Sequence, residues 1–217
     1  MSLRLFASCA PGVEPWLASE IASLVPEQFK VTPPTEIEVV PGGVMFTGDR
    51  QTLEHALVGL GLAARLFVRI AEFPVRHLNE FEKLLSRMEW EPWLRSNEPF
   101  VVRATSKKSK LYHSGAIVER VLRAVRKSLN IVDQGSTSES SITRTEEETP
   151  CLVVRMEHDL CTISLDVSGT PLHRRGYRKN PFRAPLREDL ARALVVASGW
   201  DGLSTLLDPC CGSGTIL

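Results

Sequence analysis

An apolar run near the end of the chain, residues 203–207, leads directly into the sequence DPCCGSGT at residues 208–215. A strand that ends in Asp and enters a Gly-x-Gly turn is how a doubly wound α/β sheet presents a ligand at the carboxyl end of its first strand. Gly212 and Gly214 lack the Cβ atoms that would block a ligand from the backbone. The amides of the following helix would face the polar groups of that ligand. This run therefore predicts a cofactor site in an α/β domain.

The residues of the motif argue against three other interpretations. A P-loop needs Gly-Lys-Ser or Gly-Lys-Thr, but Gly214 is followed directly by Thr215. A dinucleotide fingerprint needs a third small residue where Leu217 stands. An ordinary turn does not demand so specific a run of Asp, Pro, Cys, Gly, Ser and Thr. The residues favour a nucleotide-type cofactor site of another kind.

The size and composition of the chain fit a globular protein. It has 217 residues, of which 43% are hydrophobic and 24% are charged, and this predicts one or two compact units. No run of eighteen apolar residues occurs, and the N-terminal residues lack the apolar core of a signal peptide. We therefore expect a cytoplasmic chain without a membrane partner. The five cysteines form no Cys-x-x-Cys pair, so no metal site is expected.

Charge is balanced over the whole chain but not within it. The totals are 26 basic and 26 acidic residues. Residues 103–127 carry eight basic side chains against one acid, and residues 169–187 carry six basic side chains and no acid. Clustered Lys and Arg on an otherwise acidic body attract phosphate, which favours a nucleic-acid partner. For the helical part, residues 120–127, the solvated face of an amphipathic helix explains the charge about as well.

Hydrophobic spacing predicts α and β elements in two parts. The first part runs strand, helix, hairpin, helix, strand, with Asp49 as a helix cap: 3–6, 13–25, 37–40 with 44–46, 53–60 and 66–70. The second part contains helices capped by Asn79 and Ser114 and three strands: 79–88, 100–104, 114–129, 152–156 and 161–167. A short reversal at His158 and Asp159 joins the last two strands, which predicts a hairpin. A lysine-bearing loop is expected at 105–113, and polar connections at 134–149 and 168–184. A helix over 186–197 then precedes the strand at 203–207.

The motif DPCCGSGT closely resembles the first cofactor motif of class I S-adenosylmethionine-dependent methyltransferases, in the variant carried by THUMP-containing RNA methyltransferases. Residues 171–200 are similar to the segment that joins the THUMP and catalytic domains in that family, with its HRRGYR and APLRE runs. In particular, the chain resembles bacterial 23S ribosomal RNA guanine-N2 methyltransferases. It also resembles their relatives described as N6-adenine-specific DNA methylases.

This resemblance implies an α+β fold of successive domains. A ferredoxin-like unit at 1–74 would be followed by a THUMP RNA-binding domain at 75–167 and a linker at 168–184. Residues 185–217 would form the first helix and strand of a Rossmann-like methyltransferase domain. The catalytic motif would lie beyond Leu217, so the resemblance assigns no catalytic residue within these positions. The chain alone is accordingly expected to be inactive.

The resemblance also implies which residues bind ligands. S-adenosylmethionine, the cofactor of the full-length enzyme, would contact Asp208, Gly212, Ser213, Gly214 and Thr215. The RNA partner, expected to be ribosomal, would contact the basic side chains of the two charged windows: Lys107, Lys108, Lys110, Arg174, Arg175 and Arg178.

Three functions remain open on this sequence. The first is the RNA-recognition part of an enzyme that methylates a base amine of ribosomal RNA, with guanine N2 favoured. The second is a non-catalytic RNA-binding module. The third is N6-adenine methylation of DNA, which uses similar catalytic motifs but fits less well with shape-based binding of folded RNA. Tyr112 and Tyr177 are candidate base-stacking side chains, with packing as the more ordinary alternative.

Overall fold

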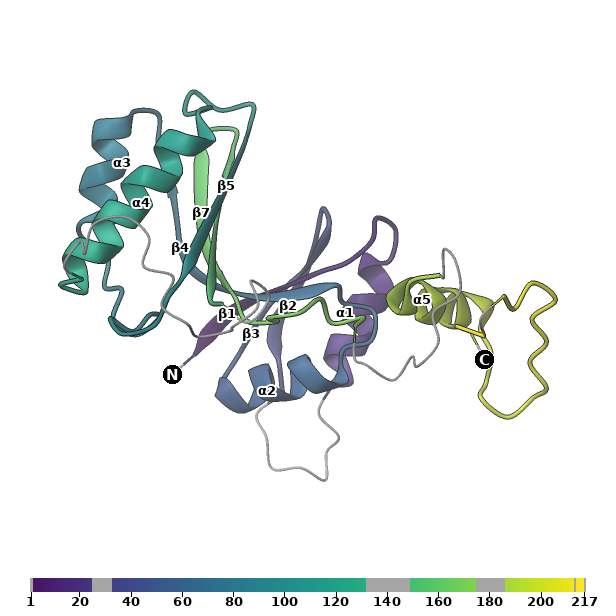
Figure 1. Ribbon diagram of the computed structural model, residues 1–217. Helices are drawn as coiled ribbons and strands as arrows, with labels where there is room; N and C mark the ends of the chain where they lie inside the picture. The colour runs from purple at the N-terminus through teal and green to yellow at the C-terminus, as the bar shows by residue number, and fades with distance from the viewer. Residues whose placement is uncertain (1, 25–32, 132–148, 175–185, 213, 217) are drawn as a thin grey trace. The chain divides into compact units, whose positions relative to one another are not determined.

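The computed structural model describes residues 2–24, 33–131, 149–174, 186–212 and 214–216. The chain divides into two compact units (Figure 1). One unit comprises residues 1–68 together with 170–217, and the other comprises residues 69–169. Strand β4 carries the chain from the first unit into the second.

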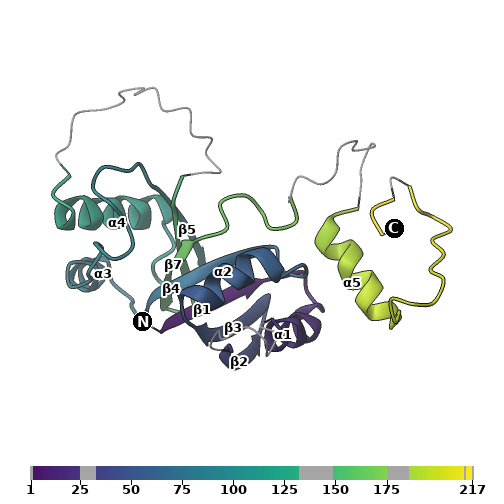
Figure 2. The same cartoon turned by 90° about the horizontal axis from the view of Figure 1, so that it is seen from below.

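The first unit is built on an antiparallel sheet with strand order β2-β3-β1-β4. Each helix connects two parallel strands that are separated by an antiparallel one, so the unit contains two split β-α-β motifs (Figure 2). This is the ferredoxin-like arrangement, as expected from the sequence. Its elements are β1 (Leu3–Ser8), α1 (Glu14–Ala22), β2 (Thr35–Val40), β3 (Gly43–Gly48), α2 (Arg50–Gly59) and β4 (Arg65–Pro74).

Local sequence explains the predicted β2–β3 hairpin and the helix after it. Gly42 has a φ of +83°, a conformation that suits glycine. Gly43 lies so close to β1 that an added Cβ would be 2.2 Å from the carbonyl oxygen of Ala7. Asp49 caps α2 by accepting from the amide of Thr52 at 2.8 Å, and the Thr52 hydroxyl accepts from the Asp49 amide at 3.3 Å. This reciprocal pair forms a capping box.

A buried carboxylate joins three segments of the first unit. Glu20 on α1 accepts hydrogen bonds from the amides of Gly61 and Leu62, at 3.1 and 3.0 Å. It also pairs with Arg192 of α5 (Glu188–Ser198), whose Nη2 lies 2.7 Å from Glu20 Oε1. The Glu20 side chain is only 12% exposed, so these donors replace the water that the charge loses. The contact ties α5 to residues far away in sequence.

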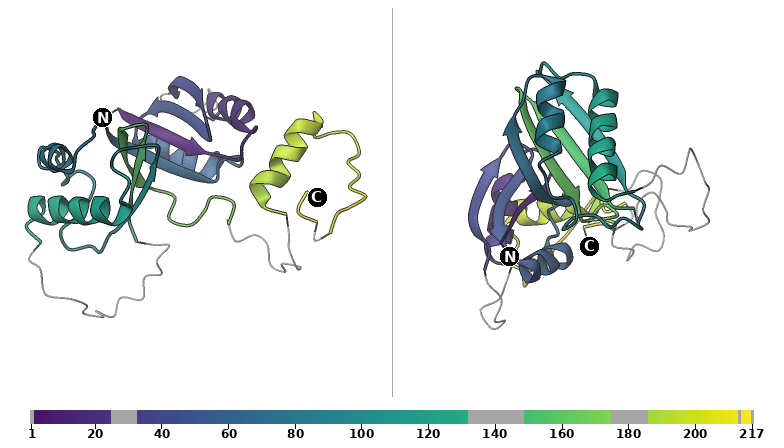
Figure 3. Two further views of the ribbon diagram at one scale, coloured as in Figure 1. Left: turned by 90° about the horizontal axis from the view of Figure 1, so that it is seen from above. Right: turned by 90° about the vertical axis from the view of Figure 1, so that its left-hand side faces the viewer.

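The second unit has strand order β4-β7-β6-β5, with β5 and β6 parallel and β6 and β7 antiparallel. Helices α3 and α4 lie side by side on one face of this sheet (Figures 1 and 3). The predicted β6–β7 hairpin is confirmed, and His158 and Asp159 both have positive φ angles in its turn. The elements are α3 (Leu78–Leu85), β5 (Val101–Lys107), α4 (Ser114–Ser128), β6 (Cys151–Glu157) and β7 (Leu160–Asp166).

The core of the second unit forms between the helices and the sheet. Trp90 is fully buried, and its indole N–H donates to the carbonyl of Leu85 at 3.3 Å. Cys161 is also fully buried, and burial raises the pKa of its thiol to about 12. All five cysteines are free thiols, and Cys161 acts as a small apolar side chain, as predicted.

Three local predictions were wrong. His77 and His113 are the N-cap residues of α3 and α4, so Asn79 and Ser114 lie inside their helices. Lys107 belongs to the end of β5 rather than to the loop, because its backbone pairs with Glu157 on β6. The two helix caps lie two residues and one residue before the predicted positions, and β5 ends three residues later than predicted because its pairing with β6 continues to Lys107.

The predicted strand at 203–207 is also absent, although the helix before it forms as α5 and ends at Gly199 with a φ of +68°. Leu203 is 91% exposed and Leu207 is 83% exposed. A parallel strand is stable only when neighbouring strands and covering helices bury both of its faces. Within the described residues, no strand pairs with this segment.

None of the described helices is long and apolar enough to span a bilayer.

Candidate nucleic-acid interface and cofactor motif

The three lysines predicted to bind RNA lie together at one end of the second unit. Lys107 ends β5, and Lys108 and Lys110 follow in the segment before α4. All three side chains are exposed. We call residues Lys107–Lys110, the last residue of β5 and the three that follow it, the lysine loop. Exposed ammonium groups at this density can reach successive phosphates of a nucleic acid.

Hydrogen bonds on both sides hold the lysine loop in one conformation. The hydroxyl of Ser106 donates to the carbonyl of Leu111 at 2.6 Å, which closes the base of the loop. The amide of His158, in the β6–β7 turn, donates to the carbonyl of Lys107 at 3.2 Å. Lys108 has a φ of +50°, a left-handed conformation that costs a non-glycine residue about 1–2 kcal/mol. The surrounding contacts must offset this cost.

An exposed aromatic residue follows the lysine loop. Tyr112 is 69% exposed, and its ring centroid lies 4.0 Å from that of His113. Tyr112 therefore does not pack in the core, which is the alternative to base stacking. Its neighbour Leu111 is buried instead. Tyr177, the other candidate, lies outside the described residues. An exposed ring beside basic side chains can stack on an unpaired base.

The basic residues of α4 are engaged differently from those of the lysine loop. Arg120 and Arg123 both pair with Glu82 of α3, and Arg123 also pairs with Glu119 at 2.7 Å. Arg126 and Lys127 lie in the last turn, where cations are favourable because the helix C-terminus is partly negative. These contacts support the interpretation of α4 as a solvated helix face.

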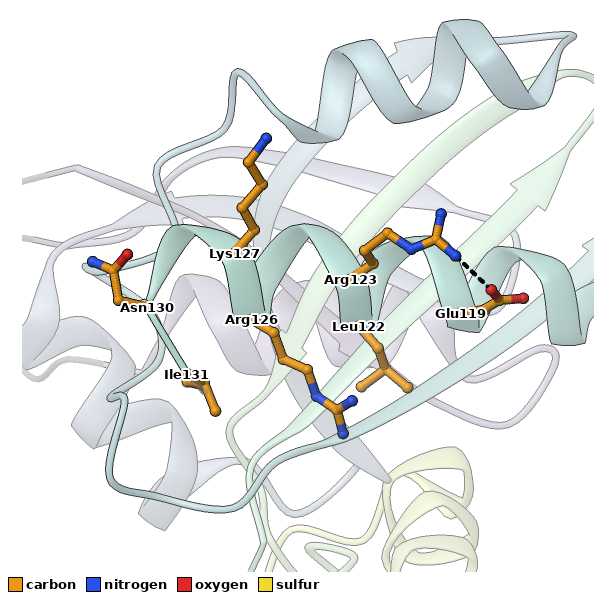
Figure 4. A pocket seen from close by; sticks show the side chains of 7 residues that line it. All are labelled: Glu119, Leu122, Arg123, Arg126, Lys127, Asn130 and Ile131. Atoms are coloured by element: carbon orange, nitrogen blue, oxygen red, sulfur yellow. Dashed lines mark hydrogen bonds and ion pairs between the residues drawn. The ribbon is translucent and has the colours of Figure 1, made fainter. Parts of the chain in front are cut away.

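A shallow cavity of about 640 Å³ lies along the C-terminal half of α4 (Figure 4). In Figure 4 the guanidinium of Arg123 points along the helix to Glu119, away from the end of α4. The lining mixes two apolar side chains with acidic, basic and amide groups: Glu119, Leu122, Arg123, Arg126, Lys127, Asn130 and Ile131. The pairing of Arg123 lowers the positive charge that this cavity offers to an anion.

The predicted arginine contacts lie in the other unit. Arg174 is exposed, and its amide donates to the carbonyl of Pro171 at 2.8 Å. Arg175 and Arg178 lie outside the described residues. Because Arg174 and the lysine loop belong to different units, a continuous RNA surface that includes both stays a prediction.

The cofactor motif forms a hydrogen-bonded turn. The carboxylate of Asp208 accepts from the amide of Cys210 at 2.9 Å, and the amide of Gly214 donates to the carbonyl of Cys211 at 2.7 Å. Gly212 and Gly214 have φ angles of +53° and +71°, so both positions favour glycine by conformation. An added Cβ would meet no atom within 3.4 Å at either glycine.

The motif has the Gly-rich turn expected for the predicted cofactor, but most of its residues are exposed rather than enclosed. Cys210, Cys211, Gly212 and Gly214 are exposed, and Ser213 lies outside the described residues. Thr215 lines a cavity of about 420 Å³ together with residues of α2 and α5, but Asp208 and Gly214 do not line it. Among the described residues, no group of His, Cys, Asp and Glu side chains could hold a metal ion.

Sequence reasoning missed two carboxylates that organise these regions. The sequence places Asp159 only in a turn, yet its side chain contacts both the lysine loop and Arg76. Glu20 was an unremarked position on a helix, and its partner Arg192 is 172 residues away. No pattern in the sequence marks either contact, because each depends on segments that the fold brings together.

Two protein families match parts of the chain. The family described as the RlmL ferredoxin-like domain matches residues 4–67. The family described as RMKL-like, methyltransferase domain matches residues 175–217. The first match covers the ferredoxin-like sheet of the first unit, and the second includes α5 and the cofactor motif.

Individual proteins agree with these matches. The chain is 32% identical over 221 residues to ribosomal RNA large subunit methyltransferase K/L of Syntrophotalea carbinolica, covering 99% of this chain and 29% of that protein. It superposes with a TM-score of 0.84 and 30% identity on a predicted N6-adenine-specific DNA methylase from Listeria monocytogenes, covering 100% of this chain and 53% of that one.

A third comparison is with SMU.472, a methyltransferase solved in complex with SAH. The TM-score is 0.79 and the identity 27%, covering 99% of this chain and 54% of that one. The chain thus spans about half the length of these two structures and less than a third of the curated relative. Residues 4–67 are thus similar to the RlmL ferredoxin-like domain, and residues 175–217 are similar to the RMKL-like methyltransferase domain.

Proposed function

We propose that this chain is the RNA-recognition part of an S-adenosylmethionine-dependent methyltransferase that modifies a base amine of ribosomal RNA, with guanine N2 as the target. The observation that carries the proposal is the exposed, hydrogen-bonded lysine loop in a chain whose other segments match a ribosomal RNA methyltransferase family. The relative named as a large-subunit ribosomal RNA methyltransferase supports the choice of RNA. A ribosomal substrate agrees with a cytoplasmic location.

The proposed division of labour follows the predicted domains. Residues 1–74 form the ferredoxin-like domain, residues 75–167 a THUMP domain, and residues 168–184 a linker to the methyltransferase segment at 185–217. The lysine loop and Tyr112 belong to the THUMP part, where lysines would hold phosphates and the ring would stack on a base. Phosphate contacts position an RNA, whereas contacts to bases select it.

S-adenosylmethionine would supply an activated methyl group, and Asp208, Gly212, Ser213, Gly214 and Thr215 are the residues proposed to hold it. The SAH complex of SMU.472 supports this cofactor. The remaining work of the enzyme is orientation, because the base amine must leave its stack and align with the methyl carbon. The described residues would contribute by holding the surrounding RNA in place.

Methylation of adenine N6 in DNA is the second candidate, and the name of the Listeria monocytogenes relative favours it. The two candidates differ in the nucleic acid that the chain should bind. Folded RNA exposes unpaired bases and 2′-hydroxyls, whereas duplex DNA stacks its bases inside. The exposed ring of Tyr112 suits the first kind of ligand.

We expect the chain to bind a labelled hairpin of large-subunit ribosomal RNA at least tenfold more tightly than duplex DNA of equal length. The physical reason is that stacking on an unpaired base adds about 1–3 kcal/mol to a phosphate attraction common to both ligands. Fluorescence anisotropy at physiological salt measures both dissociation constants. Equal affinity for the two would indicate a site that binds any polyanion. Tighter binding of DNA would favour the second candidate.

We also expect no methyl transfer by this chain alone and no micromolar binding of S-adenosylmethionine. Residues 209–212 and Gly214 are exposed, and the cavity that Thr215 lines does not include Asp208, so these residues do not together enclose a ligand in that cavity. Incubation with labelled cofactor and ribosomal RNA tests transfer, and titration calorimetry tests binding. Turnover above a control without protein would contradict this expectation.

A further inference from the structure

The turn between β6 and β7 presents Asp159 to the lysine loop. Its Oδ1 accepts from the backbone N–H of Lys110 at 2.8 Å. Its own N–H donates to the hydroxyl of Ser109 at 3.0 Å. Two neighbouring residues of the loop are therefore bound by one residue of the turn, through its side chain and its main chain. This reciprocal pattern resembles a capping box, but it connects segments 49 and 50 residues apart.

A third segment meets the same carboxylate. Oδ2 of Asp159 accepts from Nε of Arg76 at 3.1 Å. The carbonyl of Asp159 accepts from the amide of Val75 at 2.8 Å. The Asp159 side chain is 21% exposed, so its bonds are partly shielded from water. Asp159 thus joins the lysine loop to the segment that follows β4.

The placement of an acid here runs against simple electrostatics. An aspartate among exposed lysines lowers the positive potential. It should weaken phosphate binding, because that binding depends on positive charge that displaces counterions from the nucleic acid. The conformation of Lys108, which has a φ of +50°, indicates another role for Asp159. A loop that contains a residue in this conformation persists only where its surroundings hold it. Asp159 supplies bonds on the C-terminal side of Lys108.

We propose that Asp159 is a positioning residue for nucleic-acid binding: its bonds to Ser109 and Lys110 hold the lysine loop in the conformation that contacts phosphate. This inference rests on the proposed RNA function of the loop. The benefit from a preformed loop exceeds the electrostatic cost of the negative charge, because an unordered loop would pay its conformational entropy on binding.

Two substitutions at this position separate charge from hydrogen bonding. Asp159→Ala and Asp159→Asn remove the same negative charge. The Asn side chain keeps an oxygen that can accept from the Lys110 amide, and Asn tolerates the φ of +63° at this position, whereas Ala has neither property. Loss of the charge alone should tighten RNA binding by about fourfold at physiological salt, the contribution of roughly one phosphate contact. The proposal expects Asp159→Ala to weaken binding by about five- to tenfold, and Asp159→Asn to bind at least as tightly as the parent.

The experiment measures the affinity of the full chain and both variants for the labelled ribosomal RNA hairpin as a function of salt. Asp159→Ala should also flatten the dependence of log affinity on log salt, whereas a pure charge effect would steepen it. Amide hydrogen exchange reports the loop itself: the Lys110 amide should exchange at least tenfold faster in Asp159→Ala, with Val153 on β6 unchanged as the folding control.

The outcomes distinguish this inference from the proposed function. If both variants bind RNA more tightly than the parent, or if Lys110 exchanges at the parental rate in Asp159→Ala, Asp159 does not position the loop. If the parent binds RNA but charge reversal of the three lysines has no effect, the site lies elsewhere and the role of Asp159 in binding is overturned. If the parent binds no RNA, the proposed function itself fails, while the Lys110 exchange still shows whether Asp159 orders the loop.

Discussion

Reversing the charge of Lys107, Lys108 and Lys110 together to Glu is expected to weaken RNA binding by about two orders of magnitude at physiological salt. Each lost phosphate contact is worth roughly four- to fivefold there, and the three losses multiply. The new negative charges add repulsion. The slope of log affinity against log salt should become shallower by about 2–3, since 0.7–0.9 counterions are released for each contact. Anisotropy titrations at several salt concentrations measure both quantities.

A matched variant separates the site from net charge. Lys83, Arg87 and Arg95 are exposed on and after α3, so their combined change to Glu alters the total charge of the chain equally. This control should lose only the long-range attraction, which salt screens. The lysine variant should bind all RNA sequences more weakly without a change of preference, because phosphate contacts carry no sequence information. Equal losses in the two variants would refute a localised site.

The second large effect concerns the segment before the cofactor motif: the amide of Leu206 is expected to exchange with solvent at least a thousandfold faster than that of Val153. Val153 lies in the middle of β6, between β5 and β7, so its N–H faces a neighbouring strand. Leu206 lies in no helix or strand. Core amides exchange only through opening reactions that approach the global free energy of unfolding, about 5 kcal/mol or more for a stable domain.

Hydrogen exchange followed by mass spectrometry or NMR on a dilute monomer tests this expectation. Dilution matters because association with a second copy could cover the exposed side chains of Leu203 and Leu207. Protection of Leu206 equal to that of Val153 under these conditions would mean that residues 203–207 form a stable strand after all. Protection that appears only at high concentration would point to association between copies.

The lysine loop and the cofactor motif differ in how completely their structures are formed. The lysine loop is held by hydrogen bonds from a completed sheet, so it can meet a ligand with little reorganisation. The turn at 208–215 has internal hydrogen bonds, but no strand of the described residues pairs with the segment before it. The lysine loop is therefore the formed surface to which we assign the proposed RNA binding.

Much of the fold could be predicted because it depends on neighbours in sequence. Pro41, Gly42 and Gly43 permit a tight turn between two apolar β-branched runs, and the hairpin forms there. The spacing of Ile117, Val121 and Val125 places them on one face of α4, and all three are buried. The motif at 208–215 could be identified as a Gly-rich turn for the same reason, since positive φ angles select glycine locally.

The sequence by itself thus determined the strand, helix, hairpin, helix, strand succession of the first unit, the lysine-bearing segment and the Gly-rich turn, all of which follow from short-range spacing and residue type. Only the tertiary structure decided that Asp159 binds the lysine loop, that Glu20 binds Arg192, and that no strand of the described residues pairs with residues 203–207. These outcomes depend on contacts between distant segments. A hydrogen bond across 49 or 172 residues leaves no periodic signal, because the fold, and not the spacing, brings its partners together.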